Sequence, residues 1–372
     1  MTTTVEVTRT TESGERKPSR SLWGDAWYRL RKNRMAMVSL WTLAAMGLLA
    51  VLTPLLPLAP PRRVDMDRAF APPCVSPLFE KSFPLPGAES QEGDAGDEVA
   101  VDPIAEGFGR LDPFSGMLLS IRLRLFGAWS LSPVCGTDKL GRDVLSRVMW
   151  GGRISIAVGI VATLVSLVIG VTYGAISGFL GGWIDNVMMR LVDILYSIPF
   201  IFVVIFLITI LSAEPIKNTL ETEYGINRVV VFFFVVGAIY WLTMARVVRG
   251  QVIVLKNELF VEAARAIGAG TPRIIFRHIV PNLMSVVIVY LTLTIPRVML
   301  FEAFLSFLGL GVEPPDVSWG LLANEGLQAI TPVRIYWWLV AFPSLALAVT
   351  LFALNFLGDG LRDALDPRLK NL

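Results

Sequence analysis

Few residues of this 372-residue chain have the type and spacing that a catalytic or metal site requires. His278 is the only histidine, and Cys74 and Cys135 lie far apart with no CxxC pair, so a zinc site built by this chain is not expected. No lysine follows a glycine, so the G-x-x-x-x-G-K-S/T loop that cradles nucleotide phosphates is missing. We expect a non-catalytic chain that binds no cofactor of its own.

Two ionisable residues, Arg297 and Glu302, follow a long uncharged run. Ionisable groups at membrane depth usually face a protein interior or water and mark a transport path. Their spacing is not the i,i+3 or i,i+4 of a helical ion pair. We interpret them as candidates for a substrate path; contact with another subunit, or a position at the membrane surface, is the alternative.

The composition indicates a polytopic membrane protein. The chain is 54% hydrophobic and 17% charged, whereas soluble domains carry about 25% charged residues. The net charge of +2 gives no support for a nucleic-acid partner. A helix needs about 20 apolar residues to cross a bilayer, and six uncharged runs come near or exceed that length: 35–61, 154–184, 194–213, 229–245, 279–296 and 335–358. We therefore predict an all-α fold with six transmembrane helices.

The distribution of charged residues predicts how these helices are oriented in the bilayer. Six spans put both termini on one side, and the arginine-rich and lysine-rich segments before the first span, around 246–277 and after 361 share that side, which is cytoplasmic by the positive-inside rule. The first apolar run follows a long polar tail and indicates an uncleaved anchor. The predicted divisions are a tail and lead-in at 1–34, a first span at 35–58, a large irregular extracytoplasmic insertion at 59–150, a five-helix core at 151–361 that includes a cytoplasmic loop at 251–281, and a tail at 362–372.

The insertion contains several features of its own. We expect residues 1–20 to be a disordered tail and "GAESQEGDAGDE" in the insertion to be a solvated, mobile loop. Both cysteines lie in the insertion, where Cys74 and Cys135 could form a disulfide in an oxidising compartment or stay as two thiols.

The stretch "GTDKLGRDVLSRVMWGGR", residues 136–153, precedes the second run. Thr137 can cap a helix with Asp138 in its first turn, and apolar residues then recur at helical spacing. We predict an amphipathic helix near 137–150 that lies along the outer membrane surface. An ordinary interfacial lead-in is the alternative.

The stretch "NELFVEAARAIGAGTPRIIFRHIVPN", residues 257–282, has the pattern of two short helices. The first ends at Gly268 and Gly270, because glycine allows a left-handed C-cap. Thr271 then caps the second, with Pro272 at its first position, and Pro281 marks the start of the next span. We predict a rigid helical knob on the cytoplasmic side; a loop that packs only on its own bundle is the alternative.

This stretch resembles the EAA loop of permease subunits of ABC importers, in which EAA is followed by three residues, a glycine, nine residues and I-x-L-P. The matching residues are Glu262, Ala263, Ala264, Gly268 and Pro281. His278 and Val280 depart from the isoleucine and leucine of the pattern. The resemblance implies that the knob is a coupling helix that docks on an ATP-hydrolysing subunit, through Glu258, Phe260, Glu262, Ala263, Ala264, Arg265, Gly268 and Pro281.

Further stretches resemble the C-type permeases of the peptide/nickel importer class, and the oligopeptide-permease C-type subunits most of all. They are "GTDKLGRDVLSRVMWGGRISIAVG", "SGFLGGWIDNVMMRLVDILYSIPF", "LSFLGLGVEPPDVSWG" and "NFLGDGLRDALDPRLK". The resemblance covers about residues 22–370 and implies a type I importer permease architecture in a bacterial inner membrane. It also implies a second homologous permease subunit, two ATPase subunits that carry ATP and Mg, a peptide-binding protein outside the membrane, and contact with membrane lipid.

Residues 308–320, "LGLGVEPPDVSWG", are expected on the outer side. Glycines and prolines preclude a continuous helix there, and Trp319 suits an interfacial position. The segment could receive a loaded binding protein, or form a packed re-entrant turn that seals the outer mouth.

Other functions remain as alternatives at this point. A permease of the same architecture could carry dipeptides or nickel chelates. An ion-driven secondary transporter would keep ionisable relays at mid-membrane, but the middles of the six runs are uncharged. A membrane receptor or scaffold would leave the knob unexplained.

Overall fold

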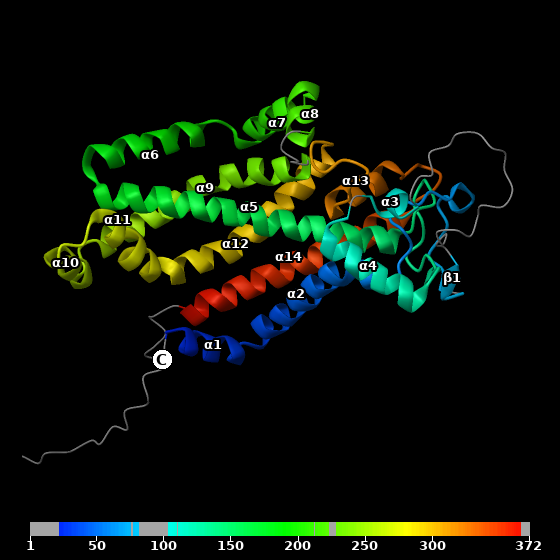
Figure 1. Cartoon of the computed structure of the whole chain (residues 1–372), viewed down its shortest axis with the longest axis horizontal. Helices are drawn as coiled ribbons and strands as arrows, with labels where there is room; N and C mark the ends of the chain where they lie inside the picture. The colour runs from blue at the N-terminus through cyan, green and yellow to red at the C-terminus, as the bar shows by residue number, and fades with distance from the viewer. Residues whose placement is uncertain are drawn as a thin grey trace, which may run out of the picture.

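The computed structural model describes residues 22–75, 77–81, 103–109, 111–211, 213–222 and 228–365. The predicted tail at 1–20, the loop "GAESQEGDAGDE" and most of the tail at 362–372 lie outside these residues. The described helices of the long bundle are α1 (Leu22–Lys32), α2 (Arg34–Leu52), α5 (Val144–Leu180), α6 (Gly182–Ser197), α7 (Phe200–Leu211), α8 (Glu214–Thr222), α9 (Arg228–Leu255), α12 (Val280–Phe307) and α14 (Trp337–Leu365). Short elements occupy its two ends (Figure 1).

The prediction of an all-α membrane fold is confirmed. Among the described residues, five segments are long and apolar enough to span a bilayer: Arg34–Leu55, Val144–Leu180, Val230–Leu255, Thr271–Phe307 and Trp337–Leu365. The pair α6 and α7 is a sixth only if two helices bent by 85° count as one span. Figure 1 shows the long helices side by side, with α1 and the last turn of α14 toward the same end.

The predicted span at 194–213 is not one continuous helix. The chain leaves the helix at Ile198, whose backbone is extended (φ −79, ψ 128), and α7 begins after Pro199. Proline has no N–H to donate and disfavours helical conformation in the residue before it. The apolar run therefore contains a break that hydrophobicity does not reveal.

Helix α5 is the central element of the bundle. It packs along α9 and also touches α12, α2 and α14. The approach to α9 is close, because a Cβ on Gly174 would lie 2.3 Å from the carbonyl oxygen of Ala245, and one on Gly178 would lie 2.8 Å from that of Arg249. Small residues allow such approach between helices in membranes.

The predicted amphipathic helix near 137–150 is also wrong. Residues 137–143 form a turn in which Thr137 and Asp143 make an isolated β-bridge, and α5 begins only at Val144. The Asp138 carboxylate accepts hydrogen bonds from the backbone N–H groups of Leu140 and Arg142 (both 2.9 Å), which fixes the turn. Asp143, not Thr137, caps the helix, because its side chain accepts from the N–H groups at 145 and 146.

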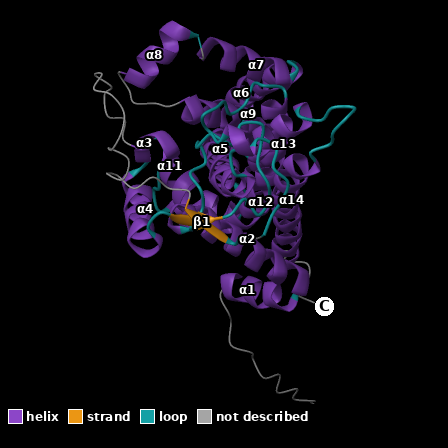
Figure 2. Cartoon of the chain, turned by 90° about the vertical axis from the view of Figure 1, so that its right-hand side faces the viewer, coloured by secondary structure: helices purple, strands orange, loops and turns teal. Residues whose placement is uncertain are grey.

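The insertion at 59–150 is more ordered than expected where it is described. The 3₁₀ turn η1 (Thr53–Leu55) lies just before it. The insertion contains the 3₁₀ turn η2 (Met66–Arg68), the helices α3 (Pro103–Phe108) and α4 (Pro113–Phe126), and a two-stranded sheet of β1 (Phe79–Lys81) and β2 (Trp129–Leu131). The strands are antiparallel, with Glu80 opposite Ser130. These elements lie at one end of the bundle beside α13 (Trp319–Gln328) (Figures 1 and 2).

The segment at 308–320 is packed into the protein at residues 311–312 and 317–320 and exposed at residues 313–315. After an irregular stretch, Ser318 caps α13 by accepting from the N–H of Leu321 (3.2 Å). Trp319 is 2% exposed, and its Nε1 donates to the carbonyl of Val148 (2.8 Å) in α5. The expected membrane-surface position of Trp319 is therefore wrong, since its indole is inside the protein.

The two cysteines are not joined in a disulfide. Cys74 is exposed and Cys135 is buried, although their segments run close together, with the N–H of Cys74 3.4 Å from the carbonyl oxygen of Pro133. Burial raises the pKa of the Cys135 thiol to about 11, and a thiol reacts as its thiolate.

We therefore expect a maleimide reagent to label one cysteine per folded chain, at Cys74, and a second after denaturation. Intact-protein mass measurement checks this. A chain that takes up no label until it is reduced would contain the alternative disulfide.

Candidate functional site

The stretch at 257–282 folds as two short helices at the end of the bundle opposite to α13 (Figure 1). They are α10 (Leu259–Ala266) and α11 (Thr271–Ile274), and the latter continues through the π turn η3 (Ile275–Ile279) into α12. Pro281 lies inside this continuous helix and does not begin a new one. The π turn η3 lies just before Pro281. Pro281 has no N–H to donate to the carbonyl groups of that preceding turn.

The glycine turn between α10 and α11 is as predicted. Gly268 has φ +82, and its N–H donates to Arg265 (2.9 Å) while that of Ala269 donates to Ala264 (3.0 Å). This left-handed residue ends α10 sharply. The predicted cap at Thr271 is one residue off, because Gly270 occupies the cap and Thr271 is already helical.

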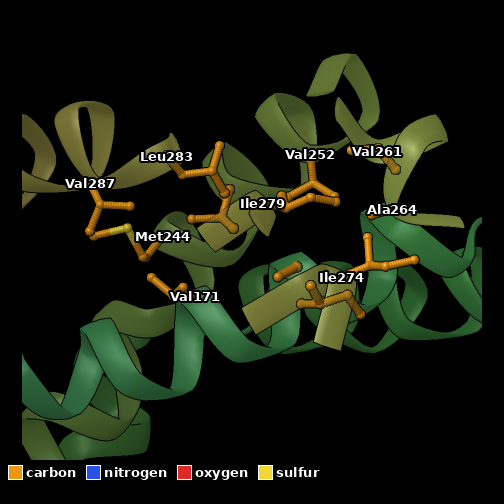
Figure 3. Packing of buried hydrophobic residues seen from close by; sticks show 12 residues of the cluster. Val171, Met244, Val252, Val261, Ala264, Ile274, Ile279, Leu283 and Val287 are labelled. Atoms are coloured by element: carbon orange, nitrogen blue, oxygen red, sulfur yellow. The ribbon is translucent and has the colours of Figure 1, made fainter. Parts of the chain in front are cut away.

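One face of the knob, defined as α10, α11 and their connecting turn, is packed into the bundle. Val261, Ala264 and Ile274 are at most 4% exposed. They share one apolar cluster with residues of α5, α9, η3 and α12: Val171, Ala175, Met244, Val248, Val252, Ile275, Ile279, Leu283 and Val287. Figure 3 shows these side chains converging between the helices. Because this core is close-packed, a displacement of the knob has to move the helices that hold it.

The other face of the knob is open and apolar at its tip. Leu259 is 80% exposed and Ile267 is 84% exposed. Ala263, Ala266 and Gly268 in the same stretch are small and also exposed. An exposed surface that combines small residues with two large apolar side chains is suited to contact with another protein surface.

The structure distributes the predicted coupling residues over both faces. Ala264 is buried and Phe260 is half-buried, so these two belong to the packed face. The exposed ones are Glu258, Glu262, Ala263, Arg265, Gly268 and Pro281. The Arg265 guanidinium also lies 5.3 Å from the ring of Phe179 in α5.

Sequence reasoning missed two features of the knob. The first is the exposed pair Leu259 and Ile267, which the helical pattern did not single out. A large apolar residue beside the EAA residues is a signal for contact with another protein when the bundle offers it no partner. The second feature is a clamp at the base of the knob: Arg249 donates to both Asp185 oxygens (2.6 Å each), and Ser177 donates to Asp185 (2.5 Å). The clamp ties α6 to α9 and α5.

Arg297 and Glu302 are not brought together. Arg297 is exposed, whereas Glu302 is fully buried (0% exposed). The Glu302 carboxylate accepts a hydrogen bond from Ser306 (2.7 Å) and lies 3.5 Å from the Ser155 hydroxyl, which accepts from the N–H of Trp319 (3.0 Å). In this conformation Glu302 holds α12, α5 and α13 together.

A second buried polar cluster lies at the end of the bundle opposite to the knob. Arg147 Nη1 contacts Asp138 Oδ2 (2.7 Å) and Glu325 Oε2 (2.6 Å), and Arg142 contacts the same two carboxylates (2.7 and 3.6 Å). These four residues join the 137–143 turn, the start of α5 and α13.

Comparison with known proteins places this geometry in context. Residues 170–371 match the family described as the binding-protein-dependent transport system inner membrane component. Residues 21–73 match the N-terminal transmembrane domain of oligopeptide transport permease C.

Individual relatives agree with these matches. The chain is 36% identical to the dipeptide transport system permease protein DppC of Bacillus subtilis, over 95% of this chain and 88% of the relative. It is 50% identical to the oligopeptide transport system permease protein OppC of Salmonella typhimurium, over 73% and 82%. With OppC of Escherichia coli the identity is 52%, over 63% and 72%. A solved inward-facing MetNI methionine ABC transporter chain matches 58% of this chain and 94% of its own, with 19% identity and a TM-score of 0.43.

Proposed function

Because this chain belongs to the family of inner-membrane components of binding-protein-dependent transport systems, we propose that it is the permease subunit of an ATP-driven importer of peptides. The proposed substrates are oligopeptides, since relatives with about half of their residues identical carry that name. The proposed architecture is that of a type I importer, with both termini cytoplasmic in a bacterial inner membrane. An ion-driven secondary transporter is not favoured by membership of this family.

The observation that carries the proposal is the two-faced knob. Its exposed tip presents Leu259 and Ile267 to a partner, and its other face is packed among α5, α9 and α12. A force applied at the tip is therefore transmitted to the spans, because close-packed cores transmit strain. The partner we propose is an ATPase subunit that carries ATP and Mg, one of two in the complex.

ATP binding and hydrolysis are then coupled to transport by a shift between an outward-open and an inward-open state of the spans. Closure of the two ATPase subunits on ATP moves this knob and that of a second, homologous permease subunit, and the spans open outward to receive peptide from a binding protein. Hydrolysis lets the knobs separate, and the spans open inward. This chain makes and breaks no bond in that cycle.

The test is ATP-dependent uptake of a labelled oligopeptide by proteoliposomes that contain the full complex. Uptake is expected to be lost in Gly268→Asp and retained in Gly270→Asp. A Cβ atom added at either glycine meets no atom within 4 Å. Only Gly268, with φ +82, has a backbone conformation that L-residues avoid. Gly270 has φ −69.

Three readouts distinguish the outcomes. Assembly of the Gly268→Asp complex with lost uptake supports coupling through the knob. Full uptake by Gly268→Asp contradicts it. ATP hydrolysis or peptide uptake by the purified chain without ATPase subunits contradicts the proposed function as a whole.

A further inference from the structure

Helix α4, in the insertion, carries an exposed apolar stripe that the transport function leaves unexplained. Phe114, Met117, Ile121 and Leu125 recur at the spacing of one helical face. They are 49%, 52%, 39% and 68% exposed. Ser120 and Arg124 lie beside this stripe and are also exposed. The helix thus has an apolar face with a polar edge, neither of them covered by described residues.

The face of α4 that adjoins this stripe is held firmly in place. Leu118, Leu119 and Arg122 are buried, and Arg122 donates to the carbonyl of Leu58 (3.0 Å). At the start of the helix, Asp112 caps it by accepting from the N–H of Ser115 (3.1 Å), and its carboxylate lies 3.6 Å from the guanidinium of Arg153 in α5. The stripe is therefore presented in a fixed direction by a helix that cannot roll over to bury it.

The position of α4 relates the stripe to the membrane. The helix packs against η1, which is the last turn of the apolar span Arg34–Leu55. Two residues of α2 shortly before η1 are themselves exposed and apolar, with Leu48 60% and Val51 50% exposed. Seen from the end that carries β1 and α13, α4 lies at the periphery of the helix bundle (Figure 2). The stripe thus continues the lipid-facing surface of a span at the level where that span ends.

The flanking residues have the chemistry of a membrane surface. Trp129, directly after the helix, is 47% exposed, and the ammonium group of Lys81 lies 5.7 Å from its ring. Tryptophan is enriched at membrane–water interfaces. Cations beside an amphipathic helix, here Arg124 on the polar edge of α4 and Lys81 at the end of β1, can contact lipid phosphates.

We propose that α4 is an interfacial helix whose stripe of Phe114, Met117, Ile121 and Leu125 inserts into the boundary between lipid headgroups and acyl chains. The occupant of this face is phospholipid of the leaflet that adjoins the insertion. The amphipathic surface helix that the sequence placed near 137–150 thus lies instead at 113–126. It anchors the insertion to the bilayer beside α5, and it acts independently of the transported substrate.

The experiment measures the accessibility of spin labels in the full chain, reconstituted in phosphatidylcholine–phosphatidylglycerol nanodiscs without partner proteins. Labels are attached through Ile121→Cys and, as a matched control, through its neighbour Ser120→Cys on the polar edge. Both are made in a Cys74→Ser background, since the buried Cys135 reacts slowly. The ratio of accessibility to oxygen, which enters lipid, over that to a water-soluble nickel chelate is expected to be several-fold higher at 121 than at 120.

Two results would overturn the proposal. Equal ratios at 120 and 121 would show that the stripe is in water. A ratio at 121 that matches 120 until the binding protein or a second permease subunit is added, after which both reagents are excluded, would identify a protein-docking surface. Leu125→Cys repeats the measurement on the same stripe if Ile121→Cys does not fold.

Discussion

Ile267→Asp is expected to abolish the binding of the ATPase subunit while the permease itself stays folded. Ile267 is 84% exposed at the tip of the knob, so the substitution removes little packing within the chain. In the proposed interface it places an unpaired charge in an apolar contact, which typically weakens binding by about 2 to 4 kcal/mol, or about 30- to 1,000-fold. The measurement is the affinity of the detergent-solubilised permease complex for purified ATPase subunits.

The matched control is Val333→Asp. Val333 is 89% exposed in the segment between α13 and α14, at the opposite end of the bundle (Figure 1). Val333→Asp introduces the same charge at an equally exposed apolar position. The affinity of the permease complex for the ATPase subunit is expected to stay unchanged. Equal loss of affinity in both variants would indicate a general effect of the added charge. Unchanged affinity in Ile267→Asp would show that the tip of the knob does not contact the ATPase subunit.

Arg147→Met is expected to destabilise the protein by about 3 kcal/mol, at the lower end of the range for breaking a buried ion pair. Its guanidinium is 4% exposed and contacts both Asp138 and Glu325. Removing it takes away positive charge that neutralises two largely buried carboxylates. Arg142 remains beside both carboxylates and offsets a part of the lost stability. The measurement is the unfolding free energy of the solubilised chain in denaturant.

A double-mutant cycle isolates the pairwise interaction in this cluster. Arg147→Met leaves the carboxylates of Asp138 and Glu325 without one of their cationic partners, and adding Glu325→Gln removes one of these two negative charges. The double variant is therefore expected to be more stable than the sum of the two single changes predicts. A loss within about 0.5 kcal/mol for Arg147→Met, as for ordinary surface substitutions, would mean that the cluster does not hold the 137–143 turn to α13.

The knob shows how far local sequence reasoning reaches. The bounds of α10 and the turn at Gly268 depend on neighbouring residues, because helix propensity and a left-handed cap are local properties. Which side of α10 is buried was not predictable from the stretch alone. Val261 and Ala264 face inward only because α5, α9 and η3 bring Ala175, Val252 and Ile279 beneath them.

The errors near the opposite end have a common physical cause. Residues 136–153 have the pattern of a helix, but the first seven residues after Gly136 find better hydrogen-bond partners in distant segments. The Thr137 hydroxyl accepts from the N–H of Ala71 (2.8 Å), and the carbonyl of Asp138 accepts from the N–H of Phe70 (2.9 Å). Trp319 likewise has the character of an interfacial residue until α5 offers the carbonyl of Val148 to its indole.

The sequence by itself therefore determined the class of the protein, the number of apolar runs, and the knob with its motif. Hydrophobicity summed over a run and the capping of a short helix are sufficient for that. The break in the third run at Pro199 is a local property of proline that hydrophobicity does not reveal. The tertiary structure alone decided where α5 starts and which faces of α4 and α10 stay open. It also decided that Glu302 is enclosed by Ser155 and Ser306. These outcomes depend on partners that lie far away in the chain, and a buried polar group takes the position in which those partners satisfy it.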